Sequence, residues 1–176
     1  KADRELVLQA VWQNPRSLRH AAVPLKSDRE LVLEAVRQDG RALEFAAEPL
    51  KADRELVLEA LWQNPLSLRH AADSLKADYE LVLQAVRWDG LALEYADEFL
   101  QADCEMVLEA LWQNPLSLRH AADRLKAARE LVLQAVRWDG LALEYADELL
   151  QADRELVLQA VWQNPRSLRH AAVPLK

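Results

Sequence analysis

The sequence predicts an all-α protein, an α-solenoid of seven helix-turn-helix repeats of 25 residues each. Three observations predict it. The same residues recur at a spacing of 25, the apolar residues inside each repeat follow helical spacing, and the helices are too short to be stable alone. Each repeat must therefore pack on its neighbours, as in a solenoid. We expect a single array over residues 1–176, with units that start near residues 1, 26, 51, 76, 101, 126 and 151.

Each repeat opens with a helix. An Asp before a run such as RELVLQAVW at residues 4–12 is typical of a helix N-cap, and the Glu at the fifth position of every repeat complements the helix dipole. Leu6, Val7, Ala10 and Val11 make one apolar face on a helix of about 11 residues, roughly 16 Å long. The capping Asp is replaced only at Ala128, and its other copies are Asp3, Asp28, Asp53, Asp78, Asp103 and Asp153.

A second, shorter helix follows a sharp turn. The turn is Asn-Pro in odd repeats, as at residues 14–15, and Asp-Gly in even repeats, as at residues 39–40. Asn or Asp can cap a helix, and Pro is tolerated at its first position, so we expect a helix through residues 17–22. We expect Leu25 and its equivalents to fill the gap between units. Prolines should help to end the second helix at three places, Pro24, Pro49 and Pro174.

Odd and even repeats differ consistently, which gives a longer period of 50 residues and an alternating order of two repeat types. Position 12 of the repeats reads Trp12, Arg37, Trp62, Arg87, Trp112, Arg137 and Trp162. Position 19 reads Arg19, Glu44, Arg69, Glu94, Arg119, Glu144 and Arg169. Neighbouring helices lie roughly 8 to 10 Å apart, so we expect alternating charges along position 19 and guanidinium groups against indoles along position 12. Exposed pairs contribute about 0.2 to 1 kcal/mol each, so we assign them to specifying the order of the repeats.

The tryptophans indicate a candidate binding surface. Trp88 and Trp138 stand one position later than the position-12 tryptophans, which places all six at the end of the first helix. Trp and Arg are enriched at binding hot spots, so we take position 12 together with Trp88 and Trp138 as a candidate partner-binding strip. The alternative is that these side chains are amphipathic lids that cover the seam between helices.

The even repeats carry a recognisable phrase, EAVRQDGRALEFA at residues 34–46. It resembles a domain-of-unknown-function repeat family whose units read approximately AVxxxGxALEYAxxxLxxD. The resemblance covers all seven units and is most specific in Leu43-Glu44, the aromatic Phe45, Ala46, Leu50 and Asp53. It implies a short-helix solenoid and no catalytic activity. Odd repeats depart from it with Pro in place of Gly and Arg-His in place of Glu-Tyr.

Residues that could carry chemistry lack the arrangement that chemistry needs. The histidines His20, His70, His120 and His170 recur every two repeats, on the order of 20 Å apart, whereas zinc ligands lie about 2.0 to 2.1 Å from a common point. Each has a Ser three residues earlier, but no orienting acid or oxyanion hole accompanies the pair. Cys104 occupies a position that holds Arg in five other repeats, and we interpret it as surface drift. We therefore expect no enzyme activity, no metal and no cofactor.

Charge and hydropathy limit the partners. The net charge of −7 disfavours nucleic acid and anionic membranes, because phosphate attraction dominates such affinities. The apolar runs are too short for a membrane span, so we expect a soluble protein. A single unpaired Cys is compatible with a reducing intracellular compartment, although the sequence does not identify the compartment.

The function expected from these observations is a non-catalytic scaffold for protein-protein interaction, the common use of a solenoid surface. The alternative is a structural or self-assembling repeat protein, because residues 2–26 and 152–176 are identical and neither end has a polar cap. Simple head-to-tail stacking would place Arg169 against Arg19, so we expect part of a longer array, or an oligomer with lateral or two-fold contacts.

Overall fold

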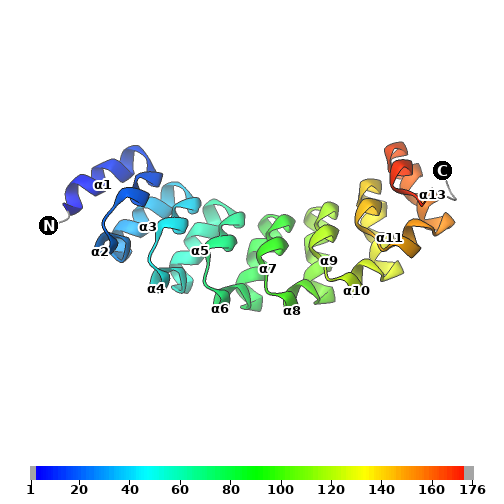
Figure 1. The fold of residues 1–176 in the computed structure, drawn as a ribbon, viewed down its shortest axis with the longest axis horizontal. Helices are drawn as coiled ribbons and strands as arrows, with labels where there is room; N and C mark the ends of the chain where they lie inside the picture. Colours follow the sequence, from blue (N-terminus) through cyan, green and yellow to red (C-terminus); the bar gives the residue numbers. More distant parts are fainter. Residues whose placement is uncertain (1–2, 173–176) are drawn as a thin grey trace. The chain divides into compact units, whose positions relative to one another are not determined.

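The computed structural model describes residues 3–172, which form an all-α tandem-repeat fold (Figure 1). The chain divides into two compact units, unit 1 with residues Lys1–Ala85 and unit 2 with residues Val86–Lys176. Within each unit the repeats follow one another as a long α-helix, a 3₁₀ helix and a short α-helix, and in the last repeat the described residues contain the first two of these elements. The predicted fold class is confirmed, with one helix more per repeat than expected.

The long helices have ten residues each, close to the predicted length. They are capped as predicted: the side chain of Asp53, for example, accepts hydrogen bonds from the backbone N–H groups of Glu55 and Leu56. Only Ala128 provides no side-chain cap, at the start of α11. The seven helices are α1 Arg4–Gln13, α3 Arg29–Gln38, α5 Arg54–Gln63, α7 Tyr79–Trp88, α9 Cys104–Gln113, α11 Arg129–Trp138 and α13 Arg154–Gln163.

The second element is a 3₁₀ helix of six residues. It starts and ends two residues earlier than the helix predicted at residues 17–22. The predicted cap is confirmed: Asn14 accepts from the backbone N–H of Arg16, and Asp39 from that of Arg41. The helices are η1 Pro15–His20, η2 Gly40–Phe45, η3 Pro65–His70, η4 Gly90–Tyr95, η5 Pro115–His120, η6 Gly140–Tyr145 and η7 Pro165–His170.

The third element is a short α-helix, and the prolines in it do not have the predicted role. Pro24 and Pro49 do not end a helix but lie in the first turn of a short one, where the missing N–H group leaves no bond unmade. Pro174 lies outside the described residues. The short helices are α2 Val23–Lys26, α4 Glu48–Lys51, α6 Asp73–Lys76, α8 Glu98–Gln101, α10 Asp123–Lys126 and α12 Glu148–Gln151.

Apolar side chains of the long and 3₁₀ helices form the core of each unit. In α9, for example, Val107, Ala110 and Leu111 are fully buried, and so is Leu118 in η5. The leucine expected to fill the gap between successive repeats is buried at Leu25, Leu75 and Leu125, and half-buried in the even repeats. Backbone bonds also join successive repeats, such as the 2.9 Å bonds from Ala72 N to Lys51 O in unit 1 and from Ala122 N to Gln101 O in unit 2.

The glycine of the even repeats helps to explain why odd and even repeats alternate along the chain. A Cβ on Gly90 would lie 2.2 Å from the carbonyl oxygen of Ala110 and 2.9 Å from Ser117 Oγ of the following odd repeat. Gly40 meets Ala60 and Ser67 in the same way. Odd repeats have Pro where even repeats have Gly. An even repeat therefore accepts the close approach of an odd one, and this contact specifies the order of the repeat types.

Candidate partner-binding surface

The six tryptophans of the candidate strip lie at or near the C-terminal ends of the long helices, as predicted. All are exposed, from 37% for Trp138 to 94% for Trp162. This exposure agrees both with a partner-binding strip and with amphipathic lids over the seam, and both interpretations stay predictions. The large exposed area of the indoles leaves apolar surface available to a partner.

The Trp and Arg residues of position 12 share a contact with the next repeat. Trp12 Nε1 donates a 3.1 Å hydrogen bond to Glu34 Oε1. The Arg37 guanidinium pairs with Glu59 at 3.4 Å, and that of Arg87 pairs with Glu109 at 3.2 Å. Sequence reasoning placed the guanidinium groups against indoles, whereas both of these arginines contact a carboxylate. In these three cases an indole or a guanidinium supplies an N–H donor to the glutamate at position 9 of the following repeat.

An aromatic pair lines a shallow groove between α9 and α11. The ring centroids of Trp112 and Trp138 are 5.5 Å apart, with the ring planes at 86°, an edge-to-face arrangement. The groove has a volume of about 420 Å³. Its remaining lining residues are Glu105, Leu108, Glu109 and Gln134. The groove therefore combines apolar surface with carboxylates at its edge.

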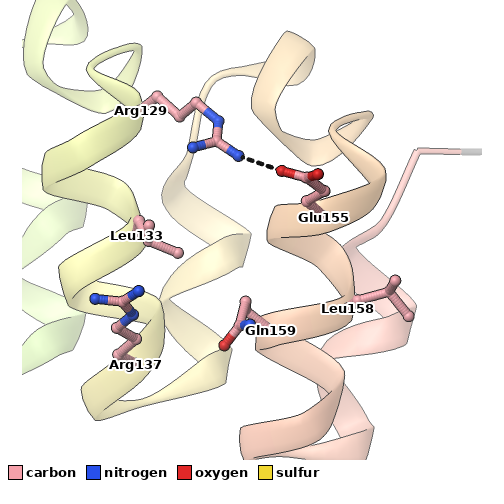
Figure 2. Close-up of a pocket in the computed structure, with 6 residues that line it drawn as sticks. All are labelled: Arg129, Leu133, Arg137, Glu155, Leu158 and Gln159. Atoms are coloured by element: carbon pink, nitrogen blue, oxygen red, sulfur yellow. Dashed lines mark hydrogen bonds and ion pairs between the residues drawn. The ribbon is translucent and has the colours of Figure 1, made fainter.

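A second groove, of about 390 Å³, lies between α11 and α13 (Figure 2). At one end Arg129 Nη2 pairs with Glu155 at 3.1 Å and joins the two helices. Toward the other end Arg137 and Gln159 project from opposite helices, and no interaction is drawn between them. Among the described residues, Arg137 makes no ion pair. The remaining lining residues are Leu133 and Leu158.

A ladder of ion pairs that sequence reasoning missed joins the starts of the long helices. Arg29 Nε lies 2.6 Å from Asp53 Oδ2, and its Nη2 lies 2.9 Å from Glu55. The hydrogen bond from Arg29 lowers the pKa of Asp53, because it stabilises the carboxylate. The same pairing joins Arg4 to Asp28, Arg54 to Asp78 and Arg129 to Asp153. Opposite charges at positions 4 and 3 of consecutive repeats were the available signal, but the Asp was interpreted only as a cap.

In unit 2, the glutamates at position 19 lie near the histidines of the next repeat. The carboxylate of Glu94 lies 3.9 Å from His120 Nε2, and that of Glu144 lies 3.6 Å from His170 Nε2. Arg119 Nε donates a 2.6 Å hydrogen bond to His120 Nε2. Burial lowers the pKa of His120, and the charge of Arg119 lowers it further. Arg119 and Glu94 therefore both contact His120, whose Nε2 accepts the hydrogen bond from Arg119.

Two exposed apolar residues were missed because they follow the acidic pairs of the even repeats. Phe99 in α8 and Leu149 in α12 are exposed by 86% and 82%. Phe99 borders a third groove of about 700 Å³ in unit 2, which is also lined by Glu94, Arg119 and His120. An apolar residue where other repeats have Pro, Ser or Arg was the signal in the sequence.

The other sites considered in the sequence show no organised chemistry. Cys104 is exposed at the first position of α9. Over residues 3–172, no group of three or more His, Cys, Asp or Glu side chains is placed to hold a metal ion. Within the same residues, none of the helices combines the length and the apolar character that crossing a membrane requires.

These features define a class, the helical tandem-repeat proteins. The chain belongs to the family of the domain of unknown function DUF4116, whose model matches residues 3–51, 53–101, 78–126 and 129–176. The resemblance inferred from the even repeats is thus confirmed. The comparisons with curated proteins and with solved structures gave no match.

Proposed function

We propose that the chain is a non-catalytic scaffold that binds protein partners through the Trp/Arg strip. The observation that carries the proposal is the exposure of all six tryptophans at one edge of the long helices. Exposed aromatic residues beside arginines are typical of the anchors of protein interfaces.

The surroundings of the strip also support binding. In unit 2, Trp112 and Trp138 border an open groove rather than an enclosed cavity. An extended peptide or a helix can lie in such a groove, whereas a small substrate would stay largely in water. The absence of an organised acid, base and nucleophile in the sequence pattern supports a role without catalysis.

The experiment is a pulldown from the source cell with the wild-type chain and a variant with four substitutions. Trp62, Trp88, Trp112 and Trp138 are each changed to Gln, and circular dichroism checks that the helices persist. We expect the variant to lose partners that the wild type retains, because most binding energy resides in a few such anchors.

A matched control uses the other exposed apolar residues. Phe99→Gln with Leu149→Gln removes apolar surface from the short helices and leaves the strip unchanged. This control should retain the partners. If the Trp variant is folded and retains every partner, the strip is not the binding surface.

A further inference from the structure

We propose that Arg137 anchors a side-chain carboxylate of a bound peptide, in the groove between α11 and α13. This inference rests on the proposed binding function and names the chemistry of the partner: an acidic residue next to an apolar one. The apolar neighbour crosses the end of α11 and lies against the indole of Trp138, which borders the adjoining groove between α9 and α11.

Arg137 differs from Arg37 and Arg87, the arginines at the same position of the other even repeats, in the residue that the next repeat offers it. Arg37 and Arg87 each meet a glutamate 22 residues further along the chain, Glu59 and Glu109. The same spacing from Arg137 leads to Gln159, an amide without charge. Arg137 therefore presents its guanidinium to the groove without the carboxylate that neutralises its counterparts.

Gln159 faces Arg137 across a groove of about 390 Å³, with Leu133 between the two helices (Figure 2). Arg129 at the other end is already paired with Asp153 and Glu155, so it offers less charge to a ligand. Arg137 is thus the group in this groove that is open to an added anion, and the Gln159 amide can donate a further hydrogen bond to it.

The end of α11, which carries Trp138, is anchored to the next repeat by Gln163. Gln163 Oε1 accepts a 2.6 Å bond from the Gly140 N–H, and its Nε2 donates a 3.1 Å bond to the Trp138 carbonyl. These bonds hold the end of α11 against the next repeat. Trp138 also contacts Trp112 edge to face. A peptide that crosses the end of α11 therefore meets the guanidinium in one groove and the indole in the adjoining one, on a backbone that is already held in place.

The whole chain carries −7, which repels acidic ligands at long range. Repeat 6 at residues 126–150 has three basic and five acidic residues, whereas repeat 7 at residues 151–176 has four basic and two acidic ones. The two repeats together have no net charge. An acidic peptide is therefore repelled less here than over residues 51–125, which together carry a net charge of −7.

The experiment selects peptides from a displayed random 12-residue library on the full chain. We expect the selected peptides to be enriched in Asp or Glu beside an aromatic or aliphatic residue. The affinity of the best peptide is then measured by fluorescence polarisation against the chain and its variants. Arg137→Ala should weaken binding about three- to tenfold, and added salt should reduce the difference between wild type and variant.

The sharpest variant uses the pattern of the chain itself. Gln159→Glu restores the glutamate that Arg37 and Arg87 already have, so the fold should be retained while the new carboxylate occupies Arg137. We expect a loss of affinity at least as large as that of Arg137→Ala. Two controls should bind like the wild type: Gln9→Glu, which adds the same charge in repeat 1, and Arg29→Ala, which removes a paired arginine that lies outside the strip.

The outcomes separate this inference from the proposed function. Selected peptides that depend on Trp112 and Trp138, but show no acidic enrichment or no effect of Gln159→Glu, overturn the role of Arg137 and leave the scaffold function standing. Binding that persists without those tryptophans contradicts the strip as well. Loss of affinity in Arg137→Ala and Gln159→Glu, with both controls unchanged, supports the proposal.

Discussion

The two compact units use the same core but differ in the charged contacts between their repeats. In unit 1, Arg4, Arg29 and Arg54 each pair with an aspartate of the next repeat. In unit 2, one position that would supply such an arginine holds Cys104 instead, and the position of its partner holds Ala128. Both members of that pair are missing together. Unit 1 thus uses its charged groups to join its own repeats, whereas unit 2 leaves some of them open, including Arg137.

The largest expected effect tests whether the two cores are equivalent. Gly90→Ala in unit 2 places a Cβ 2.2 Å from a backbone carbonyl oxygen, and Gly40→Ala does the same in unit 1. We expect each substitution to lower the free energy of unfolding by about 1 to 3 kcal/mol, because the helices must move apart. Urea denaturation followed by circular dichroism measures the loss. Unchanged stability, or a loss in only one unit, contradicts a shared core.

The next effect concerns the missing cap of α11. Ala128→Asp should raise the free energy of unfolding by about 1 kcal/mol, because the new carboxylate can accept bonds from the first free N–H groups. The same denaturation experiment measures the gain. Ala128→Asn serves as a control for charge: it should give a similar gain if capping is the cause, and none if the gain depends on the negative charge alone.

The smallest effect is expected from the removal of one ion pair of the unit 1 ladder, the pair between Arg29 and Asp53. Arg29→Ala should lower the free energy of unfolding at pH 7 by less than Gly90→Ala does, since the ion pair is partly exposed. The Asp53 pKa is lowered in the folded chain, so the contribution is complete above the unfolded pKa near 3.8 and is lost as pH falls through the lower folded value. The difference between wild type and variant should therefore shrink in acid. Denaturation midpoints from pH 7 to 2 measure it, and a difference that stays constant would rule out the pair as its source.

A matched substitution sharpens this comparison in unit 2. Arg137→Ala removes an arginine without an ion pair, so its stability should differ little from that of the wild type at any pH. A loss as large as that of Arg29→Ala would show that Arg137 has a structural role. It would also weaken the argument that its guanidinium is open to a ligand.

The repeat order, the capped helices and the position of the tryptophans were all predictable from the sequence. Each depends on a local pattern, such as Asp before an apolar helical run. The 3₁₀ helix and the third helix were less accessible, because Pro24 was interpreted as a helix breaker rather than as a first-turn residue. The ladder and the open arginine require the register between consecutive repeats. That register links positions 24 or 22 residues apart, and a pattern within one repeat does not reveal it.

The most direct test of the proposed binding, in which a peptide crosses the end of α11, follows the six indole N–H resonances by nuclear magnetic resonance. Single Trp→Phe variants assign the signals, and the selected peptide is then titrated into the full chain. The account predicts the largest shifts for Trp112 and Trp138, and little change for Trp12, whose Nε1 already donates to Glu34. Equal shifts at Trp12, or no shift at Trp112 and Trp138 on saturation, would contradict it.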